Sequence, residues 1–182
     1  MSVLKTDYAD AFHFARIAHM AVGQKRKYTG EPYHLHCVAV AEMVRAYAPE
    51  ADAAMIRAAL LHDVIEDTHV SYEDLVDDFG EEVAALVLWL SDVYTPESSG
   101  LNRARRKAME ARRYAGAPAR AKTIKLADLI DNTGSIVAHD PGFARVYLKE
   151  KADLLPALEG GNARLLERAH SVLEAAEREL LA

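Results

Sequence analysis

Cysteine is nearly absent from this sequence, since Cys37 is the only one in 182 residues. A single cysteine excludes an intrachain disulfide framework and fits a reducing compartment. No uninterrupted apolar run is long enough to cross a bilayer, and the first residues lack the apolar core of a signal peptide. These absences predict a cytoplasmic protein without a membrane partner.

An excess of positive charge is also lacking. Lys and Arg number 22 against 28 Asp and Glu, which gives a formal net charge of −6 with the eight histidines neutral. This balance argues against a nucleic-acid partner. Hydrophobic residues make up 51% and charged residues 27% of the chain, as in an ordinary globular protein. We find no convincing strand, internal repeat or low-complexity segment. The sequence therefore predicts one all-α domain over residues 1–182, with its core at about 7–158 and a C-terminal packing helix at about 162–182.

Residues 58–68 form the most informative stretch, because an apolar helical pattern becomes acidic there. His62 and Glu66 are four residues apart, as are Asp63 and Asp67. On one continuous helix each pair would lie along one side, and the two pairs would be neighbours. A buried helix gains no stability from four ionisable groups. The pattern therefore predicts that one pair binds a metal ion while the other pair acts on water.

A second polar stretch runs through residues 125–135. Lys125, Asp128, Asn132 and Ser135 are spaced three, four and three apart, so they would form one stripe on a helix. From the residues alone, a solvent-facing stripe is the more frequent explanation.

Two segments are locally basic. The loop at residues 23–33 contains Lys25, Arg26 and Lys27 in succession, which is typical either of a solvated charge run or of a site for an anion. The stretch from 103 to 125 contains nine Lys and Arg residues against Glu110 as its one acidic residue. An anionic substrate, a solvated face and a self-association surface each account for that stretch.

Three motifs resemble one known family. His62-Asp63 followed by Glu66-Asp67, the order Gly-Gln-x-Arg-Lys, Gly-x-Pro-Tyr and a histidine at residues 23–36, and Lys-x-Ala-Asp-x-x-x-Asn at residues 125–132 are similar to motifs of the HD-domain phosphohydrolases. The likeness is to the alarmone hydrolases of the RelA/SpoT type, including their small stand-alone members, and it extends from about Phe12 to Leu158. It implies an HD-type helical bundle of about eight to ten helices.

The resemblance also assigns roles. It implies four metal ligands, His36, His62, Asp63 and Asp128. It implies four substrate contacts, Arg26, Lys27, Asn132 and Ser135. Glu66 and Asp67 become the catalytic residues that orient or deprotonate water. Leu129 and Gly134 depart from the family, which commonly has a basic residue at both positions.

Two imidazoles and two carboxylates suit Mn²⁺, Fe²⁺ or Zn²⁺, and the resemblance favours Mn²⁺. The implied reaction removes the 3′-diphosphate of guanosine 3′,5′-bis(diphosphate)-type alarmones and releases pyrophosphate. Because of the two departures, a phosphohydrolase for another nucleotide, including adenosine analogues of the alarmone, remains an alternative. A non-catalytic nucleotide-binding module is a third hypothesis, and the pair Glu66 and Asp67 argues against it. The oligomeric state is left open.

Overall fold

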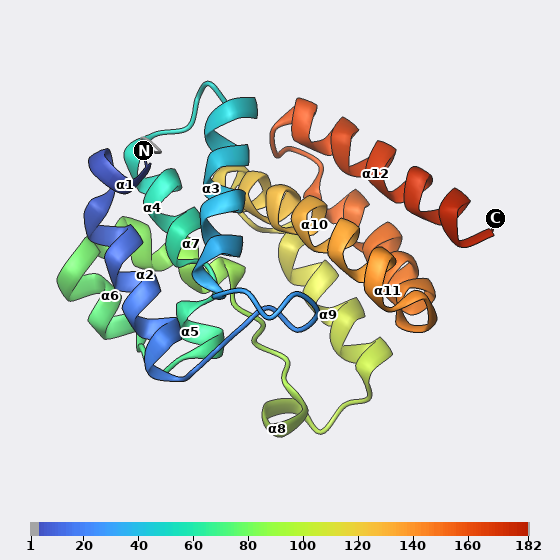
Figure 1. Ribbon diagram of the computed structural model, residues 1–182, viewed down its shortest axis with the longest axis horizontal. Coiled ribbons are helices and arrows are strands. Elements are labelled where there is room, and N and C mark those ends of the chain that lie inside the picture. Colours follow the sequence, from blue (N-terminus) through green and yellow to red (C-terminus); the bar gives the residue numbers. More distant parts are fainter. Residues whose placement is uncertain (1–3, 182) are drawn as a thin grey trace. The chain divides into compact units, whose positions relative to one another are not determined.

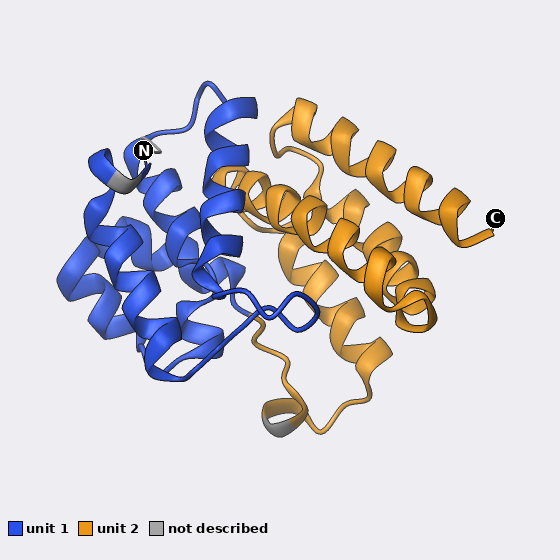
Figure 2. Cartoon of the chain, in the orientation of Figure 1, with its two compact units in different colours: residues 1–91 blue, residues 92–182 orange. Residues whose placement is uncertain are grey.

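The computed structural model describes residues 4–181, apart from the side chains of Lys5 and Glu97 (Figure 1). Within residues 4–181 the chain has nine α-helices of eight or more residues, three four-residue helices and one 3₁₀ helix. No strand occurs in this range, and no helix in it is long and apolar enough to span a membrane. The predicted all-α fold of eight to ten helices is confirmed. The chain divides into two compact units, residues 1–91 and 92–182 (Figure 2), so a single domain over the whole chain stays a prediction.

Unit 1 is built around helix α4. Its helices are α1 (Leu4–Asp7), α2 (Ala9–Ala21), α3 (His34–Tyr47), α4 (Ala53–Leu61), α5 (Val64–Asp67), α6 (Tyr72–Phe79) and α7 (Glu81–Leu90). Helix α4 packs against α2, α3 and α7, and six of its nine residues are buried. An isolated bridge between Lys25 and Pro32 closes the basic loop between α2 and α3. The central helix is therefore held on several sides, and its C-terminal end has a fixed position within the unit.

Two helices of unit 1 begin at side chains that cap them. Asp52 accepts a hydrogen bond from the backbone N–H of Met55 at 2.9 Å and begins α4. Ser71 and Asp74 form a capping box that begins α6. Such caps satisfy backbone donors that a helix cannot satisfy itself, which explains why local sequence is sufficient to predict them.

The continuous helix that we predicted through residues 62–67 is wrong. Helix α4 ends at Leu61, and the separate turn α5 begins at Val64. Asp63 lies between them with φ −105° and ψ 0°, outside the helical region. The ring of His62 bonds the carbonyl of Ala59, three residues back, at 2.9 Å. The helix thus ends where the His62 side chain binds a backbone carbonyl, and the backbone turns at His62 and Asp63, two of the predicted metal ligands.

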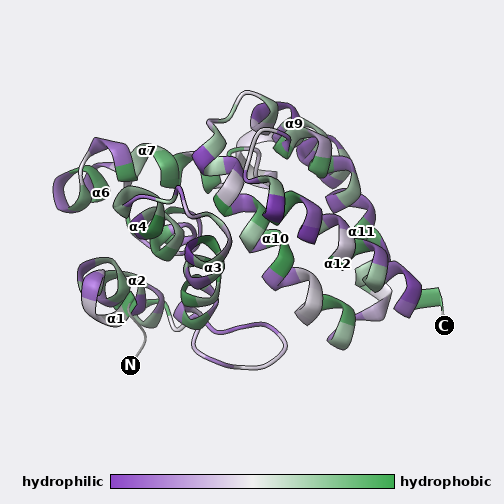
Figure 3. Ribbon diagram, turned by 90° about the horizontal axis from the view of Figure 1, so that it is seen from above, coloured by the Kyte–Doolittle hydropathy of each residue, from purple (hydrophilic) through white to green (hydrophobic). Residues whose placement is uncertain are grey.

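Unit 2 is built around helix α10. Its elements are α8 (Pro96–Ser99), α9 (Arg103–Ala115), α10 (Ala119–His139), α11 (Pro141–Leu154), the 3₁₀ helix η1 (Leu155–Leu158) and α12 (Ala163–Leu181). Helix α10 packs against α11, α12 and η1. Polar and apolar residues alternate along these helices (Figure 3), as expected of amphipathic helices that cover a core. The predicted C-terminal packing helix is α12.

The turn before α12 depends on a close approach to α10. A Cβ at Gly161 would lie 3.1 Å from Cβ of Lys122 and 3.2 Å from Cδ1 of Leu126. The buried ammonium of Lys122 donates to the carbonyls of Ala115 and Glu159 at 3.1 and 3.0 Å. Lys122, which belongs to the basic stretch at residues 103–125, therefore serves the fold.

Candidate functional site

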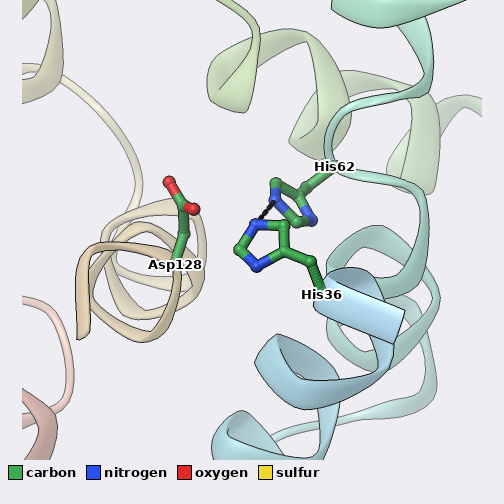
Figure 4. Close-up of side chains that lie close together, drawn as sticks. All are labelled: His36, His62 and Asp128. Atoms are coloured by element: carbon green, nitrogen blue, oxygen red, sulfur yellow. Dashed lines mark hydrogen bonds between the residues drawn. The ribbon is translucent and has the colours of Figure 1, made fainter. Parts of the chain in front are cut away.

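Two buried histidines of unit 1 face each other at the ends of two helices. His36 comes from the first turn of α3 and His62 from the C-terminal end of α4, and both are at most 2% exposed. Their Nε2 atoms are 3.2 Å apart (Figure 4). Since the carbonyl of Ala59 can only accept, Nδ1 of His62 is the nitrogen that carries the proton in the neutral ring. Nε2 is then the atom that can offer a lone pair to a cation.

The carboxylate of Asp63 joins these two rings. Its Oδ2 lies 3.0 Å from Nε2 of His62 and 3.7 Å from Nε2 of His36. The hydroxyl of Tyr33 donates to the same Oδ2 at 2.7 Å and fixes the carboxylate. Our sequence reasoning did not assign Tyr33, although it belongs to the Gly-x-Pro-Tyr motif. Its partner lies 30 residues away, so only the fold shows the contact.

The donor set fits a divalent metal ion. Two imidazole nitrogens and one carboxylate oxygen converge from His36, His62 and Asp63, with no sulfur among them. This combination is typical of Zn²⁺, Mn²⁺ or Fe²⁺ sites. Burial opposes the charged form of His62, but the adjacent carboxylate of Asp63 outweighs it and holds the pKa of His62 well above its ordinary value. A proton and a metal ion therefore compete for the same atoms.

Asp67 is oriented by a relay of side chains from α2 and the basic loop. The amide nitrogen of Gln24 donates to Oδ2 of Asp67 at 2.8 Å. The amide oxygen of Gln24 is 2.5 Å from Nδ1 of the buried His19, which therefore donates to it. Burial lowers the pKa of His19, so the ring is neutral and suited to this role. Burial, and next the charge of Asp63, raise the pKa of Asp67 above its ordinary value.

The other predicted residues of unit 1 are more accessible. Glu66 is exposed, one residue before the oriented Asp67. Arg26 is half-buried and lies at the start of a tight turn, where its backbone N–H donates to the carbonyl of Glu31 at 2.9 Å. Lys27 is exposed, and its ammonium lies 4.7 Å above the ring of Tyr28. The loop thus presents two cations from a backbone that is closed by its own hydrogen bonds.

Asp128, the third side chain drawn in Figure 4, belongs to helix α10 of unit 2. It is buried, and both of its oxygens have partners on the same helix. Lys125 Nζ lies 2.8 Å from Oδ2, and the amide of Asn132 donates to Oδ1 at 2.6 Å. The predicted polar stripe therefore pairs with itself rather than facing solvent. Ser135, the fourth member of the stripe, is half-buried near the C-terminal end of the helix.

Most of the basic stretch at residues 103–125 is used within unit 2. Arg103 forms a two-point ion pair with Glu150 at 2.6 and 2.9 Å, and Arg113 binds the buried Glu110 at 2.8 Å. Glu110 in turn accepts from the backbone N–H groups of Val93 and Tyr94. Much of the positive charge that the sequence concentrates here therefore stabilises the fold.

The sequence is similar to those of known proteins. The sequence matches the HD domain family over residues 11–154. The match and the helical fold define the class, an HD-domain protein. The chain is 34% identical over 135 residues to the Drosophila melanogaster protein named guanosine-3′,5′-bis(diphosphate) 3′-pyrophosphohydrolase MESH1, which covers 74% of this chain and 72% of that protein. The Danio rerio protein of the same name is 30% identical over 144 residues, 76% of this chain and 77% of its own. The chain belongs to the family of the MESH1 proteins, which confirms the resemblance seen in the sequence.

Longer proteins and solved structures are also similar. A Synechocystis protein, named a probable guanosine-3′,5′-bis(diphosphate) 3′-pyrophosphohydrolase, is 37% identical over 151 residues, but this chain covers only 19% of its length. A solved structure described as a metazoan ortholog of SpoT that hydrolyzes ppGpp superposes with a TM-score of 0.82 and 28% identity, covering 96% of this chain and 98% of that one. A Listeria monocytogenes crystal structure matches with a TM-score of 0.66 at 24% identity, which supports the fold alone.

Proposed function

We propose that this chain is a metal-dependent hydrolase that removes the 3′-diphosphate from guanosine 3′,5′-bis(diphosphate)-type nucleotides. The convergence of His36, His62 and Asp63, with the oriented Asp67 one turn further on, carries the proposal. The activity in the names of the Drosophila and zebrafish relatives supports the substrate. Water attacks the phosphorus next to the 3′ oxygen, the bond between that phosphorus and the 3′ oxygen breaks, and pyrophosphate is released as the 3′-hydroxyl regains a proton.

We propose Asp128 as the fourth ligand, in addition to the three donors of unit 1. The assignment rests on the motif at residues 125–132 and on the way Lys125 and Asn132 fix the Asp128 carboxylate on α10. Mn²⁺ is our preferred ion, with Fe²⁺ or Zn²⁺ as alternatives. When bound, a divalent cation supplies Lewis acidity and makes hydroxide available near neutral pH.

Glu66 and Asp67 are proposed to orient the attacking water and take its proton. Gln24 holds the Asp67 carboxylate in one direction, and the raised pKa of that carboxyl makes it a better base than an ordinary aspartate. Glu66 is exposed on the same turn and is proposed to share this work. A module that only binds nucleotides does not require an acidic group positioned in this way.

Arg26, Lys27, Asn132 and Ser135 are proposed to contact the substrate. Of the two departures from the family, only Gly134 bears on which nucleotide is bound. Leu129 is completely buried in unit 2, so the departure at this position affects the core. Gly134 is exposed, and a Cβ there would meet no atom within 4 Å. Open space where the family commonly has arginine favours a second candidate, hydrolysis of another purine nucleotide such as the adenosine analogue.

A nucleotide panel tests the proposal. The purified protein is stripped of metal with a chelator and then restored with Mn²⁺, Fe²⁺ or Zn²⁺ before each assay. We expect metal-dependent release of pyrophosphate from the guanosine 3′,5′-bis(diphosphate) substrate. Faster turnover of the adenosine analogue would favour the second candidate. Release of orthophosphate alone would place the chain among phosphohydrolases of another kind.

A further inference from the structure

Unit 2 contains a cluster of buried and half-buried charges from three helices and the segment before them. Lys107 of α9 pairs with Asp92 at 2.5 Å, and Lys125 of α10 pairs with Asp128 at 2.8 Å. Lys151 of α11 is the third cation, close enough for both pairs to act on its charge. We call these five residues the lysine cluster. Three ammonium groups and two carboxylates leave it with a formal charge of 3 − 2 = +1.

Lys151 is the member of the lysine cluster that lacks an ion pair. Among residues 4–181 no carboxylate lies within 4.0 Å of its ammonium, whereas Lys107 and Lys125 each have one. Its Nζ lies 4.9 Å from the ring centre of the buried Tyr147, and the side chain is only half-buried. Burial and the neighbouring ammonium of Lys125 lower the pKa of Lys151 to about 8. A lysine held in this way is unfavourable for the free protein unless an anion joins it.

We propose that Lys151 binds the diphosphate group that the enzyme removes, with Lys107 and Lys125 beside it. This inference rests on the proposed function and adds a residue that the sequence motifs do not include. A diphosphate fits because its several negative charges compensate the excess cation and attract the two paired lysines as well. Asp128, the proposed metal ligand, is itself paired with Lys125, so the cluster adjoins that ligand within unit 2.

Binding of inorganic pyrophosphate and of guanosine 5′-diphosphate, the two expected products, tests the proposal without turnover. Calorimetry on the Mn²⁺-loaded protein compares the parent with Lys151→Met, which keeps the length of the side chain and removes its charge. Lys149→Met is the matched control, because Lys149 lies on the same helix, is 77% exposed and pairs only with Asp153 at 3.1 Å. Circular dichroism verifies that each variant is folded.

We expect Lys151→Met to weaken pyrophosphate binding by about tenfold or more, the scale of one charge-assisted contact. Guanosine 5′-diphosphate binding should change less than twofold, and Lys151→Arg should restore part of the loss. Equal pyrophosphate binding by the parent and Lys151→Met, or an equal loss in Lys149→Met, would overturn the proposal. A selective loss of guanosine 5′-diphosphate binding would also overturn it. If the parent binds pyrophosphate through Lys151 but hydrolyses no nucleotide, the anion site stands and the proposed function fails.

Discussion

Lys151→Met should make the protein more stable near neutral pH. In the folded chain burial lowers the pKa of Lys151 from 10.5 to about 8. One pKa unit corresponds to about 1.4 kcal/mol, so keeping this lysine charged at pH 7 costs the folded state about 3 kcal/mol. Methionine has a similar length and no charge, so the substitution removes this cost without leaving a large cavity. A gain of stability on loss of a side chain is expected where the residue serves function.

The stability difference between Lys151→Met and the parent should change with pH. Above about pH 8 the folded protein has released the Lys151 proton, while the unfolded chain keeps it up to about pH 10.5. The unfolded state then binds more protons, so the stability of the parent rises with pH across this window. The advantage of Lys151→Met should therefore shrink to about 1 kcal/mol at pH 9.5.

Urea unfolding followed by circular dichroism at pH 7 and pH 9.5 measures both values, with Lys149→Met as the control. A destabilised Lys151→Met, or a gain of the same size at both pH values, would refute the reasoning.

Four further results are expected. His62→Ala should lose its metal ion yet stay folded, because the residue lies at a helix end; full metal occupancy would remove His62 from the ligand set. Glu66→Gln should keep metal and nucleotide binding while turnover falls by about 10²–10⁴-fold, the scale for a positioned general base, and parental turnover would make the residue structural. Removing the charge of Arg26 or Lys27 should raise KM more than it lowers kcat, so an unchanged KM would leave a solvated charge run. Gln24→Ala should lower kcat by about 10–100-fold with little change in KM, because Asp67 loses its orienting donor.

Local features of the fold were predictable because their causes are local. The caps at Asp52 and Ser71 satisfy donors within three residues, and the structure has both. The helix break at His62 and Asp63 was not predictable from periodicity, since apolar spacing continues through it. The break depends on side-chain bonds such as that from His62 to Ala59, which a helical pattern does not encode.

The residues that carry the donor atoms of the candidate site were predictable from the sequence, but the side chains that hold them in place were not. Sequence reasoning named His36, His62 and Asp63, and the structure brings these three together in unit 1. It did not find that Gln24 reaches Asp67 across 43 residues, nor that Tyr33 holds Asp63. A motif records which residues occur, whereas a contact between distant residues appears only when the helices that carry them pack.

The basic stretch at residues 103–125 shows why counting charges is insufficient. A count treats every lysine as available to an anion, but Lys122 is held by two carbonyls and Arg113 by a buried carboxylate. Each of these cations is already compensated, so it contributes little net attraction. Lys151 lies outside this stretch and belongs to none of the sequence motifs, yet it lacks an ion pair among residues 4–181. Where an anion binds in unit 2 should therefore depend on a half-buried cation without an ion pair, such as Lys151, and not on the place where cations are most numerous.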